Sequence, residues 1–556
     1  MLTWLRLHAN AIVIIGLTLI AVVTRVQIAL SGGAWADEAF ALLVAKGPSL
    51  GSMTAFLHFH ESHPPLFYIL LRASMQLTGD SETAVRLICA LTGVAIVPTT
   101  YALARTLFSE RAALLAMLFV TFSPALAEHS VQIRPYGLMA LLSLLSCCSM
   151  IGAIEHRYKS AWFIYVMSTI LLVYTHNWAW LIVIGQHVAV IMILSRRDAA
   201  ERKWIAISWL QSWLVIAAAF LPWTPALVYQ IGHAGHGGIP VEGMSGAVEL
   251  AAYGLYTISS TLIFGESASP WLLITAAAAG GAFVIAKSFR IRESRVTGST
   301  LTSNTPFVAV TLVVGVTVIT AIALSPFSNQ LLPRCIATLV PLAALMGGHL
   351  VDSSLRRSSA TRFVPVIAAA AACFVLVAGG VSLFAIVDTP RSNAREVANA
   401  VRARMRASDL LVISPEWFAA SFNLYFPPSI EQIDFPYRAR SGLIDFADVW
   451  YRASDPRHLA ELQSRLAEAA KAGQRVWFVS DERYLRGVSD EMIRKADARR
   501  DPVPYSILRV GQIRESLQRW YGMPDSVQTP GVRRPRYDRL QAYLYSRRPP
   551  AAVSGR

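Results

Sequence analysis

The chain has 556 residues, of which 54% are hydrophobic and only 15% are charged, and its mean hydropathy is +0.45. This composition excludes an ordinary soluble enzyme and indicates a polytopic membrane protein joined to a more polar segment. The formal net charge of +15 is compatible with nucleic-acid binding, but we exclude nucleic acid as a partner because much of the excess lies in short loops between apolar segments. The remainder lies in the C-terminal segment, where anionic lipid head groups of the bilayer are the expected partner.

Apolar segments long enough to cross a bilayer recur along the first 387 residues. The first of them is too long for the apolar core of a signal peptide, so we interpret it as a retained helix. We expect about eleven transmembrane helices on the basis of segment length and hydropathy. They lie near residues 9–30, 86–107, 111–127, 137–154, 161–175, 178–195, 204–221, 268–286, 306–325, 335–351 and 363–387.

Basic residues concentrate in alternate loops between these segments, and such loops are cytoplasmic by the positive-inside rule. This places the N-terminus in the cytoplasm and the first long loop, 31–85, on the outer, periplasmic side. We expect three segments of that loop to lie along the outer membrane surface as amphipathic helices, because a span at 64–78 would move every later basic loop outside. These segments are 39–46, 50–58 and 64–78.

Beyond Asp388 the sequence has no further apolar span and is rich in charges. Strand-like and helix-like patterns alternate there, which predicts a small α/β domain on the periplasmic side. We therefore expect two domains, a transmembrane domain over 1–387 that includes the loop 31–85, and a periplasmic α/β domain over 388–556. The predicted elements are helices at 391–407 and 457–472 and strands at 409–414 and 475–480.

Two adjacent acids, Asp37 and Glu38, follow the first predicted span. A charged side chain near the hydrocarbon region costs roughly 2.5–3.5 kcal/mol on insertion scales, so an acid pair at this depth is a candidate functional site. The alternative is a solvated loop whose acids simply favour the N-terminal dipole of a following helix. We favour catalysis, with Asp37 rather than Glu38 as the base.

Further polar residues gather at the outer ends of several predicted spans, and all of them have plainer alternatives. Arginines can extend from a helix end to the interface, and a histidine beside tryptophans fits an interfacial aromatic belt. A histidine pair spaced by three residues could bind a metal, although a following proline disfavours a regular helix there. The residues are His60, His63, Arg134, Tyr136, His176 and Arg334.

Such a set of groups suits one kind of chemistry. A carboxylate can take a proton from an acceptor hydroxyl, and arginines can stabilise a phosphate as it becomes a leaving group. The sequence contains neither a P-loop nor a dinucleotide-binding fingerprint, so we expect a membrane-borne donor, a sugar linked to a lipid phosphate.

In this order the motifs resemble those of bacterial GT-C glycosyltransferases. The branch to which the chain is similar contains the dolichyl-phosphate-mannose protein mannosyltransferases and the lipid A aminoarabinose transferase. The resemblance covers roughly residues 1–350. It rests on Asp37-Glu38, His63-Pro64-Pro65-Leu66-Phe67-Tyr68, Arg134-Pro135-Tyr136, Tyr174-Thr175-His176 and Arg334 with Pro341.

The resemblance implies an inverting, polyprenyl-phosphate-dependent glycosyltransferase in the bacterial inner membrane, acting at the periplasmic face. Asp37 would be the catalytic base and Glu38 its partner, which orients Asp37 or the acceptor or joins a metal site. Three residues, His63, Arg134 and Arg334, would bind the donor phosphate, and the cavity would be lined by His60, Tyr136 and His176.

Two positions depart from the family pattern. Many relatives have Glu-Ala-Arg-x-Tyr where this chain has Gln132-Ile133-Arg134-Pro135-Tyr136, so no metal or acceptor role is implied by an acid there. Relatives also often have an aromatic residue where this chain has Cys335.

The leading hypothesis is therefore sugar transfer from a polyprenyl-phosphate donor to an envelope acceptor, which is a lipid, a glycan or a protein. No cofactor is expected with certainty, and a divalent cation stays open. The alternatives are a transporter or flippase of lipid-linked sugars, and a scaffold subunit without catalytic activity. The sequence does not identify the sugar, and mannose is one of several possibilities.

Overall fold

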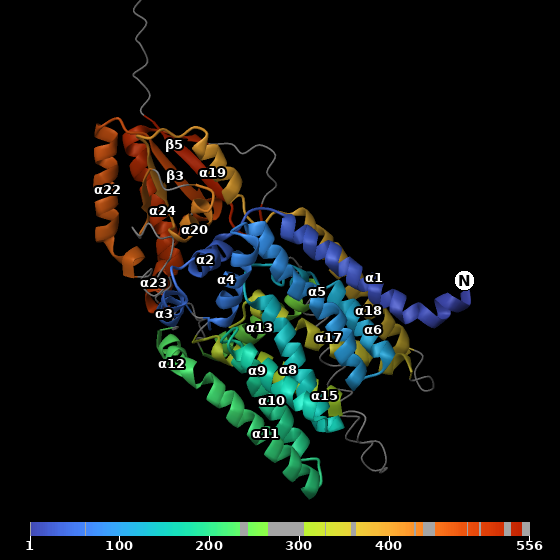
Figure 1. Ribbon diagram of the computed structural model, residues 1–556. Coiled ribbons are helices and arrows are strands. Elements are labelled where there is room, and N and C mark those ends of the chain that lie inside the picture. The colour runs from blue at the N-terminus through green and yellow to red at the C-terminus, as the bar shows by residue number, and fades with distance from the viewer. Residues whose placement is uncertain are drawn as a thin grey trace, which may run out of the picture. The chain divides into compact units, whose positions relative to one another are not determined.

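The computed structural model describes residues 2–61, 63–233, 243–264, 305–327, 330–356, 363–426, 430–436, 451–485, 487–499, 502–526 and 535–546. Contacts divide the chain into two units (Figure 1). The helical unit comprises Met1–Leu30, His63–Val228 and Gly238–Val387. The α/β unit comprises Ser31–Ser62, Tyr229–Gly237 and Asp388–Arg556.

The first half of the loop 31–85 therefore differs from the expected division, which assigned the whole loop to the transmembrane domain. Residues Ser31–Ser62 group with the C-terminal segment. The reason is that α2 (Ala36–Ala45) packs against α20 (Trp417–Asn423), a helix of that segment. The neighbouring helix α3 (Leu50–His60) belongs to the same unit.

The helical unit is built from long apolar helices. Its elements are α1 (Leu2–Leu30), α4 (Leu66–Thr78), α5 (Glu82–Leu107), α6 (Glu110–Thr121), α7 (Pro124–His129), α8 (Tyr136–His156), α9 (Lys159–Val173), α10 (Ala179–Leu194), α11 (Ala199–Phe220), α13 (Gly243–Phe264), α15 (Thr305–Leu324), α16 (Pro333–Ile336), α17 (Val340–Leu355) and α18 (Phe363–Asp388). The helix α12 (Thr224–His233) follows α11 in the chain, and its residues from Tyr229 onward group with the α/β unit.

Seven helices of the described residues are long and apolar enough to cross a membrane, so the polytopic fold is confirmed. Two further apolar helices, α9 and α10, are shorter, and the predicted span at 268–286 lies outside the described residues. The predicted span at 111–127 is interrupted: α6 ends at Thr121, and α7 begins at Pro124. Ser123 causes the break, because its hydroxyl accepts the amide hydrogen of Leu126 at 3.3 Å and caps the new helix.

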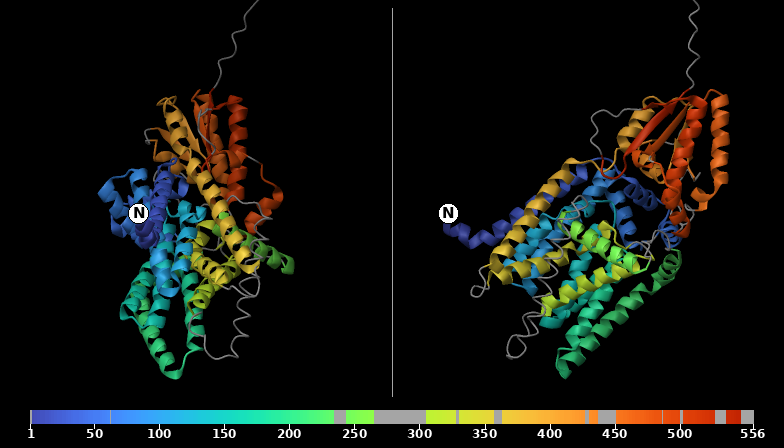
Figure 2. Two further views of the ribbon diagram at one scale, coloured as in Figure 1. Left: turned by 90° about the vertical axis from the view of Figure 1, so that its right-hand side faces the viewer. Right: turned by 180° about the vertical axis from the view of Figure 1, so that it is seen from behind.

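Burial distinguishes central helices from peripheral ones. In α8, 83% of the apolar window is buried within the protein, whereas in α1 and α18 the share is 22%. Apolar side chains that the protein does not cover suit a lipid environment. Near their C-terminal ends the two helices α1 and α18, drawn from two sides in Figure 2, pack in one cluster that includes Ile28, Leu383 and Ile386.

Two fully buried arginines of the helical unit donate to helix-end carbonyl groups. Arg25 donates from Nη1 to the carbonyl oxygen of Thr121 at 2.9 Å and from Nη2 to that of Val120 at 3.2 Å. Arg86 donates to the carbonyl oxygen of Ala29 at 3.1 Å. Since the last carbonyl groups of a helix have no partner within it, these arginines join helix ends together.

The α/β unit contains a five-stranded sheet with the order β2-β1-β3-β5-β4. The strands are β1 (Leu410–Ile413), β2 (Glu431–Asp434), β3 (Val476–Asp481), β4 (Asp525–Ser526) and β5 (Leu540–Tyr545). β1 is parallel to both β2 and β3, and β5 is antiparallel to β3 and β4. The predicted α/β domain is thus present, with both predicted strands as parallel neighbours.

Helices cover both faces of this sheet (Figure 1). Alternate strand residues point to opposite faces, so Val412 and Phe478 pack with α22 (Pro456–Lys471) and α24 (Pro502–Tyr521). Ile413 and Trp477 pack on the other face with α19 (Ala394–Arg402) and α20. The helix α23 (Asp490–Arg499) packs against α24.

Candidate active site

The acid pair lies in the first turn of α2. Trp35 is the N-cap residue of this helix, with extended backbone angles, and Asp37 and Glu38 are its second and third helical residues. Glu38 is fully buried, whereas Asp37 is partly exposed. Acids in a first helical turn are favoured by the helix dipole, so this position also fits the non-catalytic alternative, in which the acids only stabilise the helix. Of the two side chains, Asp37 is the more accessible.

A separate group of buried cationic and aromatic side chains lies in the helical unit. Arg134 is 6% exposed and its Nη1 donates to the hydroxyl of Tyr68 at 3.4 Å. Its Nη2 lies 3.5 Å from Nε2 of His63, which is itself 5% exposed. Tyr68 is fully buried and adds a polar group that the sequence analysis did not select, although it belongs to the motif around His63.

His176 connects this arginine to a second one. Its ring stacks edge-on against that of His63, with the centroids 4.4 Å apart, and lies 5.8 Å from the ring of Tyr136. The guanidinium of Arg334 lies 6.0 Å from the centroid of the Tyr136 ring, within the range of a cation–π contact. Hence His63, Arg134, Tyr136, His176 and Arg334 form one group, which we call the cationic cluster.

The charge state of His176 follows from its surroundings. Burial lowers the pKa of His176 well below its ordinary value of 6.5, and the neighbouring His63, Arg134 and Arg334 lower it further. Its Nδ1 accepts the backbone N–H of Trp178 at 3.0 Å. The ring is therefore neutral at physiological pH, and the proton that it retains is on Nε2, where it can be donated.

Prolines explain why these residues reach the ends of different helices. Pro65 is the N-cap residue of α4, Pro135 is the N-cap residue of α8, and Pro333 begins α16. Proline is favoured at a helix start because its fixed φ suits the first turn and its missing N–H is not needed there. His63, Arg134 and Arg334 consequently lie at or just before helix N-termini, where the dipole also attracts an anion.

The cationic cluster presents hydrogen-bond donors of a kind that suits an anion. Two guanidinium groups and a neutral imidazole supply hydrogen-bond donors, and burial strengthens their interaction with an anion. His60, by contrast, belongs to the α/β unit at the end of α3, where its ring lies 5.0 Å from that of Phe56. Among the described residues, no group of three or more His, Cys, Asp or Glu side chains is arranged to hold a metal ion.

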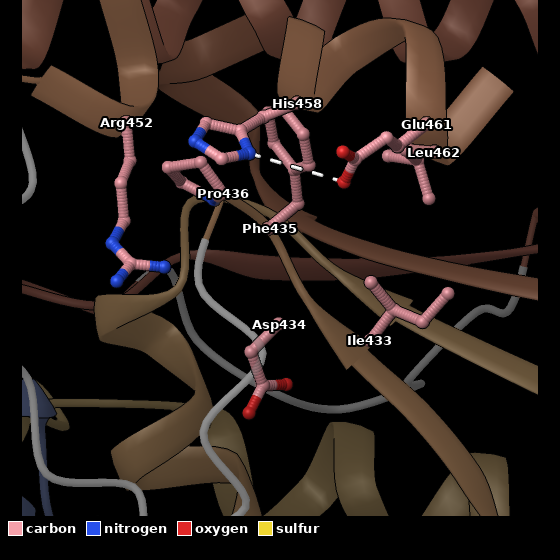
Figure 3. Close-up of a pocket in the computed structure, with 8 residues that line it drawn as sticks. All are labelled: Ile433, Asp434, Phe435, Pro436, Arg452, His458, Glu461 and Leu462. Atoms are coloured by element: carbon pink, nitrogen blue, oxygen red, sulfur yellow. Dashed lines mark ion pairs between the residues drawn. The ribbon is translucent and has the colours of Figure 1, made fainter. Parts of the chain in front are cut away.

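A cavity of about 180 Å³ lies in the α/β unit at the carboxyl end of β2 (Figure 3). None of the predicted site residues lines it. His458 and Glu461 form an ion pair of 4.0 Å at its edge. The lining residues are Ile433, Asp434, Phe435, Pro436, Arg452, His458, Glu461 and Leu462.

Comparisons with known proteins agree with this architecture. Residues 62–225 match the family described as dolichyl-phosphate-mannose-protein mannosyltransferase. No curated protein sequence matches the chain.

Similar solved structures cover nearly the whole chain. ArnT from Cupriavidus metallidurans, bound to undecaprenyl phosphate, aligns with a TM-score of 0.50 and 11% identity over 99% of this chain and 99% of that one. The oligosaccharyltransferase AglB from Archaeoglobus fulgidus, in complex with an inhibitory peptide and a dolichol-phosphate, aligns with a TM-score of 0.53 and 13% identity over 86% of this chain and 70% of that one. The apo form of the Archaeoglobus fulgidus oligosaccharyltransferase aligns with a TM-score of 0.54 and 15% identity over 91% of this chain and 73% of that one. The fold of the chain is therefore similar to that of ArnT and of the archaeal oligosaccharyltransferases, and its residues 62–225 resemble the protein mannosyltransferase family.

Proposed function

We propose that the chain is an inverting glycosyltransferase that moves a sugar from a polyprenyl-phosphate donor to an acceptor of the cell envelope. The observation that supports this most directly is the buried cationic cluster, which suits the phosphate of a lipid-linked donor. The match to a mannosyltransferase family and the fold support the same reaction class. Two similar structures hold a polyprenyl-type phosphate, dolichol-phosphate in AglB and undecaprenyl phosphate in ArnT.

In the proposed reaction, Asp37 takes the proton of an acceptor hydroxyl or amine. The acceptor atom then bonds to the anomeric carbon of the donor sugar on the face opposite the phosphate. The bond between that carbon and the phosphate oxygen breaks, and its electron pair leaves with the phosphate. Arg134 and Arg334 stabilise the charge that grows on the leaving group, which is how arginine clamps accelerate such steps. Glu38 follows Asp37 in the sequence and is fully buried, and in this proposal it orients the first turn of α2.

We place this reaction at the periplasmic face of a bacterial inner membrane, with the N-terminus in the cytoplasm and residues 388–556 in the periplasm. The support is the distribution of basic loops in the sequence. In this proposal the acceptor is an envelope lipid, glycan or protein.

The test is transfer of radiolabelled sugar from a panel of polyprenyl-phosphate sugars to extracted envelope lipids and glycans. Asp37→Asn should lower turnover by roughly 10²–10⁴-fold, the usual contribution of a general base, and leave binding of undecaprenyl phosphate unchanged. The matched control is Asp80→Asn, which neutralises an exposed acid at the end of α4.

Full turnover in Asp37→Asn would refute the base assignment. Absence of transfer with every donor, together with movement of labelled lipid across vesicles, would instead show a flippase. Harmless substitutions at Asp37, Arg134 and Arg334 alongside damaging ones in 388–556 would indicate a scaffold.

A further inference from the structure

The segment that precedes the acid pair is held by the C-terminal part of the chain. Residues Ser31–Trp35 join the first span to α2. The backbone N–H of Ala34 donates to the hydroxyl of Tyr425 at 2.8 Å. One residue earlier, a Cβ at Gly33 would lie 3.0 Å from the same hydroxyl, so the backbone there approaches Tyr425 as closely as a glycine allows.

Gly32 has a backbone conformation that ordinary residues avoid. Its φ is +70°, and a Cβ there would lie 2.9 Å from the backbone nitrogen of Arg391. Glycine alone adopts such a conformation without strain and at such a distance. The close approach to the chain at Arg391 thus depends on the absence of a side chain at Gly32.

A ring stack fixes the residue that begins α2. Trp35 is 8% exposed, and its ring stacks on that of Tyr537 with the centroids 4.4 Å apart and the planes 21° apart. Trp35 lies two residues before Asp37, at the N-cap of the helix. Any rotation of α2 about its start would therefore have to break this stack.

Tyr537 is itself fixed by backbone pairing. Its N–H donates to the carbonyl oxygen of Arg391 at 2.9 Å, and the N–H of Arg536 donates to that of Pro390 at 3.0 Å. A side-chain amide adds to this, because Nδ2 of Asn393 donates to the carbonyl oxygen of Leu540 at 2.9 Å. The support for Trp35 is thus an ordered part of the sheet unit and not a free loop.

We propose that Tyr425 and Tyr537 are positioning residues for Asp37, so that the C-terminal α/β segment belongs to the catalytic apparatus. This inference rests on the proposed function, in which Asp37 is the base. Both tyrosines act through the backbone and the helix that carry Asp37, and neither has to touch the substrate. A base on a surface loop is placed less accurately than one on a fixed helix, and a shift of about 1 Å can cost on the order of 10²-fold in rate.

The experiment compares single variants of the full-length protein in the sugar-transfer assay, with kcat normalised to folded protein. Tyr425→Phe removes the hydroxyl that binds Ala34 and should lower kcat roughly 3–10-fold, as expected for one hydrogen bond. Tyr537→Ala removes the stack and should lower kcat on the order of 10²-fold. Tyr537→Phe keeps the ring and should retain kcat.

Two controls separate positioning from a merely structural role. Tyr543→Phe removes a hydroxyl from β5 that donates to the side chain of Gln541, far from residues 31–45 in sequence, and it should be neutral. Binding of undecaprenyl phosphate should stay within about twofold of wild type in every variant, because the cationic cluster is unchanged. Hydrogen exchange should rise at residues 31–45 in Tyr537→Ala.

The outcomes distinguish the two proposals. If wild type transfers sugar and Asp37→Asn does not, but Tyr425→Phe and Tyr537→Ala keep full kcat, the positioning role is wrong while the proposed function stands. A loss of kcat in Tyr537→Phe equal to that in Tyr537→Ala would also overturn the role of the stack. If wild type transfers no sugar, the proposed function itself fails.

Discussion

Glu416 offers a quantitative test of how charge is buried in the α/β unit. It is the N-cap residue of α20 and 2% exposed, and neither carboxyl oxygen has a hydrogen-bond partner in another described residue. Burial raises the pKa of Glu416 to about 8; its own backbone amide and Arg452 oppose this rise, and Asp434 adds to it. The carboxyl is thus protonated in the folded protein at neutral pH.

The sign of the pH dependence follows from proton binding. Below pH 4.5, the ordinary pKa, the folded and unfolded states both bind the proton and the group is neutral for stability. Between that value and about 8 the unfolded state releases the proton while the folded state keeps it, so stability falls as pH rises. The loss of stability is complete above pH 8. Each pKa unit between the folded and unfolded states corresponds to about 1.4 kcal/mol, so the free energy of unfolding falls by at most roughly 5 kcal/mol.

Glu416→Gln removes the titrating proton and keeps the shape of the side chain. We expect its melting temperature to exceed that of wild type by an amount that grows between pH 5 and pH 8. If half of this maximum loss is realised, and each kcal/mol shifts the melting temperature of a domain of this size by about 2–4 °C, the difference in melting temperature should grow by roughly 5–10 °C. The assay is thermal unfolding of the full-length protein, followed by tryptophan fluorescence, at steps between pH 5 and 9.

The control is Glu468→Gln, which removes an exposed carboxylate of α22. Asp538 titrates in both wild type and variant and cancels in the difference between the two curves, which then reports Glu416 together with its interaction with Asp434. Parallel curves for wild type and Glu416→Gln across this range would refute the reasoning, because a carboxyl that stays ionised on folding has no such dependence.

Two further predictions concern the candidate site. Arg134→Gln should weaken binding of labelled undecaprenyl phosphate by roughly 10–100-fold, because one hydrogen bond to a charged group contributes about 1.5–3 kcal/mol. The control Arg105→Gln changes an exposed arginine of α5 and should leave the affinity unchanged. Wild-type affinity in Arg134→Gln would show that Arg134 does not bind the phosphate. Burial raises the pKa of Asp538 to about 7, with added effects of Asp481 and Asp37 and opposing hydrogen bonds from Ser421 and Ser392. Because Asp538 becomes ionised near pH 7, Asp538→Asn should remove an inflection near pH 7 from the pH profile of kcat. An unchanged profile would show that the charge of Asp538 does not affect kcat.

The fold class followed from local patterns in the sequence. A transmembrane helix satisfies its backbone within itself, so a long apolar segment such as 137–154 predicts a helix without reference to the rest of the chain. The α/β segment was predictable for a similar reason, since strand and helix periodicities are short-range. The break of α6 at Ser123 and Pro124 was visible as a capping residue before a proline, but the apolar residues on both sides favoured one span.

The sequence analysis also selected all five members of the cationic cluster. They lie at or near helix ends, and alternation of spans brings such ends to one side of a membrane; the members are His63, Arg134, Tyr136, His176 and Arg334. Their mutual contacts depend on packing among α4, α8, α10 and α16, and Tyr68 entered only through its contact with Arg134.

Tertiary structure alone decided what holds the acid pair. Ala34 and Tyr425 are 391 residues apart, and no periodicity in either segment indicates their hydrogen bond. Trp35 and Tyr537 are still farther apart in sequence. A stack or a single hydrogen bond between distant residues depends on where two units of backbone come together, and a local pattern contains no information about that. The sequence by itself thus indicated the candidate residues for the proposed chemistry, and the fold of the α/β unit determined how the backbone before Asp37 is held.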